Sequence, residues 1–367
     1  MSNISLDSKG VFRDVAVNVL RPKVMKQSRK WSAGVLAAGS LAMTLASGCG
    51  SGYHEASATM GAAITTSALF YSLDATDGLV LAFAPNSTGS ATEAGTLKLP
   101  AGLTPNLIAT DAQGNLYVGG YTTSVNTTEV VEYATGVTGD VVPMRTVMLD
   151  QGKLTALAVD AGGQIYAGQL NVLASVKIYA ATANGVSTPL RTIDPAYLQF
   201  VNDIAVDSSG NTYVSAWNGG AYTIVEYGTT AAGGATSLRT LYAPAGSYFG
   251  GITVDDAGDI FAMEQLTIVK FAPGATGTPS PVQAINIPGP GSGYTVESYS
   301  NVLRRDSTGN FFVPTTLSLS SNATSSQNVV FAFASTASGN ATPILQFSPQ
   351  NATVSTPLGI NIPLAVF

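Results

Sequence analysis

Residues 204–214 read IAVDSSGNTYV, an apolar stretch that leads into Asp207, then Gly210 and an aromatic residue, Tyr213. Four related stretches occur elsewhere in the chain, LIATDAQGNLYV, LAVDAGGQIYA, ITVDDAGDIFA and LRRDSTGNFFV, with aspartates at Asp111, Asp160, Asp255 and Asp306. Consecutive aspartates are 49, 47, 48 and 51 residues apart. Such a fixed period predicts a chain assembled from repeats of one supersecondary unit.

The residues around each aspartate predict a tight turn between two strands. An Asp side chain in this position can accept hydrogen bonds from backbone N–H groups two or three residues further on. The glycine then supplies the positive φ that closes a short hairpin. We therefore interpret the five aspartates as turn-forming residues rather than as catalytic acids.

Each unit contains four predicted strands. The strand with the aromatic residue is followed by a third strand, and a stretch rich in Gly, Ala and Thr leads to a fourth. The third strands end at Tyr133, Tyr179, Tyr227, Phe271 and Phe333, and the fourth lie around Arg145, Arg191, Arg239, Gln283 and Gln346. Four strands in about 48 residues are typical of a propeller blade, which buries its two faces by stacking on its neighbours.

The two ends of the repeat region predict ring closure. Residues 68–102 contain a sixth unit that lacks its first strand, and residues 357–367 form one apolar strand with nothing after it. If the last strand completes the sixth unit, no sheet edge stays open. The predicted fold is all-β, a six-bladed β-propeller of four-stranded antiparallel blades that occupies residues 67–367 and is closed by the C-terminal strand.

The repeated pattern, seen most clearly from Ile204 to Val214, resembles the NHL-type six-bladed propellers. The resemblance covers nearly all of residues 68–367 and is specific for architecture but weak for function. It implies relatives that include sugar lactonases, the streptogramin lyase, peptidyl-lyases and binding modules. The lyase resemblance implies a histidine base, whereas the repeat region contains no histidine because the only one is His54.

The N-terminal part predicts export. Residues 25–48 combine a basic start, a short apolar run and small residues before Cys49, and they resemble a bacterial lipoprotein signal. In that family the cysteine becomes the lipidated first residue, so we expect anchoring through Cys49. A plain secretory signal and an uncleaved anchor are the alternatives. Residues 1–24 read as an upstream extension without structure, and residues 49–66 as a flexible tether.

Composition excludes several functions. Residues 1–48 hold seven basic and two acidic residues, which leaves 9 basic and 20 acidic residues in the remainder. Such an acidic surface disfavours nucleic-acid binding. The single cysteine excludes an intrachain disulfide and a cysteine-based zinc site. We expect no cofactor and no metal.

Candidate ligand-binding residues lie where the first strands begin. The position five residues before each repeat aspartate holds Asn106, Thr155, Asn202, Gly250 and Asn301. Amides that face one channel can bind a small polar ligand or an ion, or each can simply hydrogen-bond a neighbouring loop. Asp203, Trp217 and Glu264 are further candidates on the same rim, where aromatic residues serve as platforms for carbohydrate or peptide or as packing lids.

The sequence favours a non-enzymatic role. We expect a lipid-anchored protein of the bacterial cell envelope, at the outer membrane or periplasmic face, whose propeller binds a protein, peptide or carbohydrate. The alternative is a metal-assisted lactonase or hydrolase of the gluconolactonase-like type that uses Asn106, Asn202, Asp203 and Asn301. A third class is a partner in envelope assembly.

Overall fold

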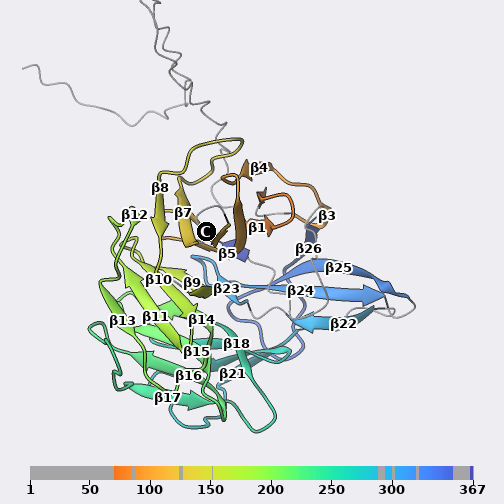
Figure 1. Cartoon of the computed structure of the whole chain (residues 1–367). Coiled ribbons are helices and arrows are strands. Elements are labelled where there is room, and N and C mark those ends of the chain that lie inside the picture. Colours follow the sequence, from red (N-terminus) through yellow and green to blue (C-terminus); the bar gives the residue numbers. More distant parts are fainter. Residues whose placement is uncertain are drawn as a thin grey trace, which may run out of the picture. The chain divides into compact units, whose positions relative to one another are not determined.

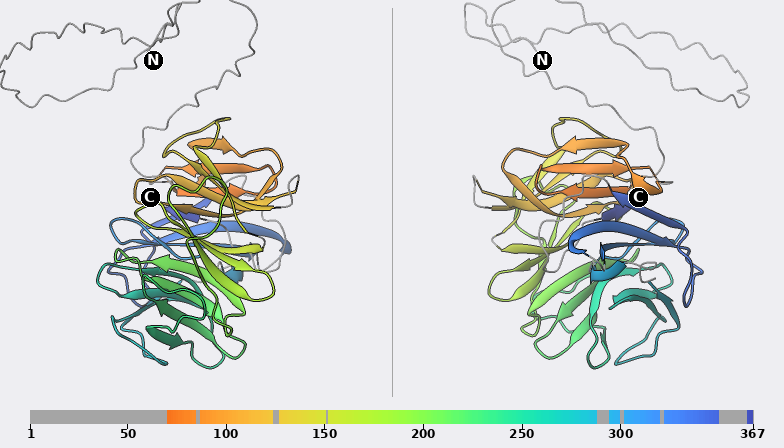
Figure 2. Two further views of the ribbon diagram at one scale, coloured as in Figure 1. Left: turned by 60° about the vertical axis from the view of Figure 1, so that its left-hand side comes forward. Right: turned by 90° about the vertical axis from the view of Figure 1, so that its right-hand side faces the viewer.

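The computed structural model describes residues 70–84, 87–123, 127–150, 152–287, 294–299, 302–319, 322–349 and 364–366. Every regular element in these ranges is a strand, and the strands form six sheets that follow one another around a ring (Figures 1 and 2). The predicted all-β, six-bladed propeller is confirmed. The predicted extension 1–24, signal 25–48, tether 49–66 and Cys49 lie outside the described residues.

The strands alternate in direction from the centre of the ring outward. We number blades 1 to 6 by their innermost strands, β5 (Leu103–Thr110), β9 (Lys153–Val159), β14 (Phe200–Val206), β18 (Phe249–Val254), β23 (Arg304–Arg305) and β27 (Leu364–Val366). The second strands, in the same order, are β6 (Leu116–Thr122), β10 (Ile165–Leu170), β15 (Thr212–Trp217), β19 (Ile260–Glu264), β24 (Phe311–Leu319) and β1 (Phe70–Asp74).

The outer half of each blade is equally regular. The third strands are β7 (Thr127–Tyr133), β11 (Ala174–Tyr179), β16 (Tyr222–Tyr227), β20 (Thr267–Phe271), β25 (Asn322–Phe333) and β2 (Leu79–Phe83). The outermost strands are β8 (Arg145–Met148), β13 (Arg191–Ile193), β17 (Arg239–Tyr242), β21 (Gln283–Asn286), β26 (Leu345–Pro349) and β4 (Gly95–Lys98). In blade 5, β22 (Tyr294–Tyr299) also pairs antiparallel with β24, further along that strand than β23 does. Two short strands, β3 (Gly89–Ala91) and β12 (Gly185–Val186), complete the set in the described residues.

Ring closure occurs as the sequence predicts. The C-terminal strand β27 pairs antiparallel with β1, with Phe70 opposite Val366 and Ser72 opposite Leu364. The first and last described strands of the chain therefore share blade 6, and β1, β2 and β4 supply its other three strands. Closure removes the two open edges that a linear stack of blades would expose.

The five Asp-x-x-Gly segments form the predicted turns, and they define what we call the turn end of the propeller. In each turn one carboxylate oxygen accepts hydrogen bonds of 2.8–3.1 Å from the N–H groups two and four residues on. The turn glycines have φ between 79° and 87°. The aspartates therefore serve as turn formers, although the second N–H lies four residues on rather than three.

A second ring of contacts links the blades at the perimeter. One residue in the loop before each outermost strand forms a parallel bridge with the outermost strand of the preceding blade. All six are glycines with φ between 59° and 87°, namely Gly89, Gly139, Gly185, Gly233, Gly277 and Gly339. The outer edge of every blade is thus covered by backbone from the next blade, which protects it from pairing with other chains.

The core lies between adjacent blades rather than at the centre of the ring. The cluster between blades 3 and 4, for example, combines Tyr213 and Ile224 with Phe249 and Phe271, all nearly inaccessible to solvent. This arrangement explains why apolar residues recur in every unit, because each blade contributes to two such clusters. In the described residues, no helix has the length and apolar character required to cross a membrane.

Candidate functional site

The central channel is narrow at the turn end. A cavity of about 180 Å³ lies between the last residues of the innermost strands. The position two residues before the repeat aspartate is small in blades 1 to 4, where it holds Ala109, Ala158, Ala205 and Thr253. Blade 5 has Arg304 there, and the small residues leave space for its side chain in the channel.

Arg304 crosses the channel to Asp203. Its Nη1 atom donates to Asp203 Oδ2 over 3.0 Å and to the Leu303 carbonyl over 2.9 Å. The same carboxylate oxygen accepts the Ile252 backbone N–H over 3.0 Å. Because Asp203, Ile252 and Arg304 belong to blades 3, 4 and 5, one carboxylate joins three innermost strands.

The Asp203 carboxyl is deeply buried, with only 5 % of its side chain exposed. Burial raises its pKa above the usual value, and Arg304 and the backbone donors oppose this effect only in part. A charge in this position is expensive unless it is paired and hydrogen-bonded, as it is here. Asp203 therefore acts as a clamp inside the ring.

The position singled out by aligning the repeats is a β-bulge. Asn106, Thr155 and Asn202 are each skipped in the pairing between the first and second strands of their blades. Blade 4 shows the same irregularity between Phe249 and Ile252, a segment that includes Gly250. A bulge re-aims the side chain of the extra residue, so this position differs from its neighbours for a structural reason.

The two bulge asparagines make equivalent contacts to the next blade. Asn106 Nδ2 donates to the Leu154 carbonyl over 2.9 Å, and Asn202 Nδ2 donates to the Phe249 carbonyl over 3.5 Å. Thr155 instead donates to Gly168 O within its own blade over 3.2 Å. These bonds assign the amide nitrogens to blade packing. Asn301 lies outside the described residues.

A groove of about 530 Å³ opens between blades 1 and 2 at the end opposite the turns. Its walls carry Asn106, the half-exposed Tyr121 and Lys153, together with Thr104, Thr128, Leu170 and Asn171. Polar groups and apolar surface are thus mixed, with one cation. Within the described ranges, no three His, Cys, Asp or Glu side chains gather in a way that would hold a metal ion.

Gly120 forms part of the groove because two strands approach closely there. A Cβ atom at this position would lie 2.9 Å from Pro105 Cα and would also clash with the Thr104 carbonyl. The glycine thus allows the bulged strand β5 to lie against β6 directly beside Asn106. Because Gly120 has no side chain, the floor of the groove at this point stays open.

The same position between blades 3 and 4 is occupied by aromatic rings. Trp217, Tyr222 and Tyr248 correspond in the repeat to Tyr121, Thr128 and Lys153. The ring centroids of Trp217 and Tyr222 are 4.8 Å apart, and those of Tyr222 and Tyr248 are 5.7 Å apart. At this interface the rings pack on one another.

Glu264 lies at the same end, in blade 4. Its carboxylate accepts a hydrogen bond from Ser247 Oγ over 3.0 Å, and its backbone pairs with Phe249. Asp203, the other predicted acid, is turned toward Arg304. Sequence reasoning placed Trp217 and Glu264 on one rim and missed Lys153 and Tyr121, which are not distinguished by the repeat alignment.

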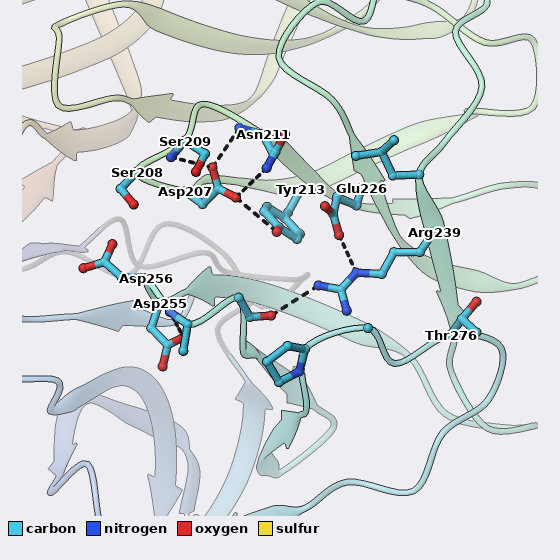
Figure 3. A pocket seen from close by; sticks show the side chains of 15 residues that line it. Asp207, Ser208, Ser209, Asn211, Tyr213, Glu226, Arg239, Asp255, Asp256 and Thr276 are labelled. Atoms are coloured by element: carbon cyan, nitrogen blue, oxygen red, sulfur yellow. Dashed lines mark hydrogen bonds and ion pairs between the residues drawn. The ribbon is translucent and has the colours of Figure 1, made fainter.

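Grooves also occur at the turn end, and they recur from blade to blade. One of about 540 Å³ lies between blades 3 and 4 and contains Asp207, Tyr213, Glu226 and Arg239 (Figure 3). Its counterpart of about 470 Å³ between blades 1 and 2 contains the equivalent Asp111, Tyr117, Glu132 and Arg145. Recurrence at equivalent places indicates grooves that come with the repeat itself.

The polar residues of these grooves bind one another. Arg239 forms an ion pair with Glu226, stacks 5.9 Å from the centre of the Tyr213 ring and donates to the Gly258 carbonyl of the next blade over 3.2 Å (Figure 3). Burial raises the pKa of Tyr213 to about 12, so its hydroxyl stays protonated and donates to Asp207. Arg145 makes the same contacts two interfaces earlier, between blades 1 and 2. These contacts link each blade to the next, and we call the cluster of Asp207, Tyr213, Glu226 and Arg239, with its equivalents, the bracket.

Comparison with known proteins supports the fold alone. No protein-family model and no curated protein matches the chain. Among solved structures, a protein of unknown function from Bacteroides caccae is similar, with a TM-score of 0.52, 10 % identity, and coverage of 82 % of this chain and 98 % of that chain.

Two further similar structures have lower scores. A protein from Lactobacillus plantarum gives a TM-score of 0.46 at 15 % identity, covering 76 % of this chain and 81 % of that chain. A gluconolactonase from Xanthomonas campestris gives a TM-score of 0.42 at 16 % identity, covering 67 % of this chain and 78 % of that chain.

Proposed function

We propose that this protein is a lipid-anchored binding protein of the bacterial cell envelope, and that its propeller holds a polar ligand without transforming it. The ligand site is the groove between blades 1 and 2. Ligand sites generally combine apolar walls with a few placed polar groups, and this groove combines both within about 530 Å³. The export and anchoring part of the proposal rests on the signal at residues 25–48 and on Cys49.

The groove chemistry favours a carbohydrate that carries a carboxylate. Tyr121, 42 % exposed, contributes an aromatic residue to the groove wall, which favours contact with a sugar, and Asn106, Thr104 and Asn171 contribute hydrogen-bonding groups. Lys153 supplies a positive charge on the same wall, in a chain whose propeller is acidic overall. A negatively charged group on the ligand therefore meets its favourable partner at Lys153.

The acids that the sequence singles out support binding rather than hydrolysis. Asp203 is engaged by Arg304 and Ile252, and Glu264 accepts a hydrogen bond from Ser247. The turn aspartates hold backbone N–H groups. Each of these carboxylates is therefore committed to a structural contact and is not positioned for proton transfer to a ligand.

Binding to an array of neutral and uronate-containing oligosaccharides tests the proposed site. We expect the wild-type protein to bind the acidic oligosaccharides more tightly than the neutral ones. Lys153→Met should weaken binding of the acidic oligosaccharides at least tenfold. Thr128→Tyr should abolish it, because a tyrosine at this position would fill the groove as Tyr222 fills the equivalent place between blades 3 and 4. Lys98→Met, which removes an exposed lysine elsewhere, is the control and should bind normally. Equal binding by all four proteins contradicts the assignment.

A further inference from the structure

Five large apolar side chains stand exposed at equivalent places around the propeller. Each is the residue before an outermost strand, and its N–H donates to the third strand of the same blade over 2.7–2.8 Å. Their exposed fractions lie between 58 % and 63 %, for Met144, Leu190, Leu238, Val282 and Ile344. We call them the apolar band. Scattered exposed apolar residues are ordinary, but five at one repeat position form a pattern.

The apolar band lies at the turn end. Outermost strands begin there, since Arg145 and Arg239, which follow Met144 and Leu238, reach the turn glycines Gly163 and Gly258 of the next blades. Met144 and Leu238 also line the same grooves as the repeat aspartates. Because the blades are repeats, the remaining three members occupy the same height in their own blades.

The loops that carry the apolar band are almost without charge. They span residues 134–144, 180–190, 228–238, 272–282 and 334–344 and consist mainly of Ala, Gly, Thr, Ser and Pro. Asp140 is the only charged residue among them, and it pairs with Lys98 over 3.2 Å. This rim can therefore leave water at a smaller cost than a charged surface can.

The chain enters the propeller at the same end. Phe70 begins β1, a second strand, and its ring lies 4.7 Å from that of Phe312, which follows the Asp306 turn of blade 5. Cys49 precedes Phe70 by 21 residues, a length that spans at most about 70 Å when extended. A lipid on Cys49 would therefore tether the propeller within this distance of the bilayer, and the tether would join the described part of the chain at Phe70, at the turn end.

We propose that the apolar band docks on the bilayer surface, so that the turn end faces the lipid and the groove between blades 1 and 2 faces away from it. This inference rests on the proposed lipid anchor. Five side chains at one repeat position can touch a flat surface together. Their nearly uncharged loops suit zwitterionic lipid better than anionic lipid, which the turn aspartates at the same end would repel.

Spin labels on the acylated protein in zwitterionic vesicles test the docking. Cys49 is the only cysteine and is blocked by acylation, so Leu238→Cys or Met144→Cys provides a single free thiol. Leu173→Cys is the matched control, because Leu173 is also 49 % exposed but lies between β10 and β11 at the opposite end. We expect a water-soluble relaxation agent to reach the label at 238 or 144 at least fivefold less than the label at 173.

The outcomes separate the two proposals. If the labelled proteins float with the vesicles and all three labels are equally accessible to water, the anchor stands and docking is overturned. If none of them floats, the anchor is absent and both proposals fail. As a second check, Leu190→Ser combined with Val282→Ser and Ile344→Ser should return the label at 238 to full water accessibility without releasing the protein from the vesicles.

Discussion

Arg304 Nη1 lies 3.0 Å from Asp203 Oδ2, although the two residues are 101 positions apart and belong to blades that do not touch as neighbours. The pair spans the channel past blade 4, whose Ile252 N–H binds the same carboxylate oxygen. No equivalent pair is present at the corresponding positions of blades 1 and 2, which hold Leu107, Ala109, Ala156 and Ala158. One ion pair thus interrupts the pseudosymmetry of the channel.

Removing one partner of this pair should cost more than removing both. Arg304→Met leaves a buried carboxylate without its cation, and we expect a loss of about 3–5 kcal/mol in the free energy of unfolding at pH 7. The double variant Asp203→Leu with Arg304→Met should lie within about 1 kcal/mol of wild type. Urea unfolding of the four proteins measures the coupling, and additive losses would show that the pair does not form.

Asp203 also predicts a pH dependence. Burial raises the pKa of Asp203 in the folded protein. At pH values between the unfolded pKa of about 3.9 and the folded pKa, the folded state therefore binds more protons than the unfolded chain. The stabilisation that protonated Asp203 contributes is complete below about pH 3.9 and is lost as the pH rises through the folded pKa.

The unfolding free energy of wild type minus that of Asp203→Asn should therefore increase as pH falls from 7 to 4. Urea titrations at several pH values provide the measurement. A difference that decreases over this range would mean that Arg304, rather than burial, dominates and holds the pKa of Asp203 below its usual value.

Replacing Arg239 by glutamine should lower the free energy of unfolding less than replacing it by methionine. Gln283 occupies the same place between blades 4 and 5 and donates to a carbonyl of the next blade, Ala337 O, over 2.5 Å. Arg239→Gln can keep one such bond, whereas Arg239→Met loses all of them and leaves Glu226 unpaired. We expect losses of about 1–2 and about 3 kcal/mol respectively.

Lys98→Met is the control for the bracket, because its ion pair with Asp140 is exposed and should contribute less than about 1 kcal/mol. Thermal or urea unfolding of the three variants gives the ranking. If Arg239→Met were no worse than Lys98→Met, the bracket would have no role in holding the blades together.

Gly233 and Gly234 offer a neighbouring pair that isolates backbone strain. A Cβ atom would meet nothing closer than 4.0 Å at either position, but only Gly233 has a positive φ, of 59°. Gly233→Ala should lose about 1–2 kcal/mol because an L-residue resists the left-handed region, and Gly234→Ala should be neutral or slightly stabilising. Equal effects in urea unfolding would show that the perimeter bridge at Ile193 does not require this conformation.

Much of the fold follows from local residue patterns. The Asp207 turn, with Gly210 at positive φ and Tyr213 behind it, is encoded within seven consecutive residues, and its repetition predicts the blades. Ring closure could be predicted because the unit at 68–102 lacks one strand. The perimeter glycines were not recognised, since single glycines in loops rich in Gly and Ala carry no clear periodic signal.

The site was less predictable because it depends on distant pairs. Alignment with the repeat aspartate singled out Asn106 and Asn202 as candidate ligand-binding residues, but it could not show that they are bulge residues whose amides bind the next blade. Arg304 is one of two consecutive arginines before the Asp306 turn, and nothing local indicates its partner Asp203. The groove depends on a small residue, Thr128, where blade 3 has Tyr222, a difference that becomes meaningful only when the blades are superposed.

Hydrogen exchange at the closure strands tests the ring most directly. In the intact protein, the amides of Leu364–Val366 and Phe70–Asp74, which pair in blade 6, should be protected to a similar extent. Deletion of residues 364–367 should greatly speed exchange in Phe70–Asp74 and leave blade 3 protected. If Phe70–Asp74 exchanged at the same rate with and without the last four residues, the C-terminal strand would not close the propeller.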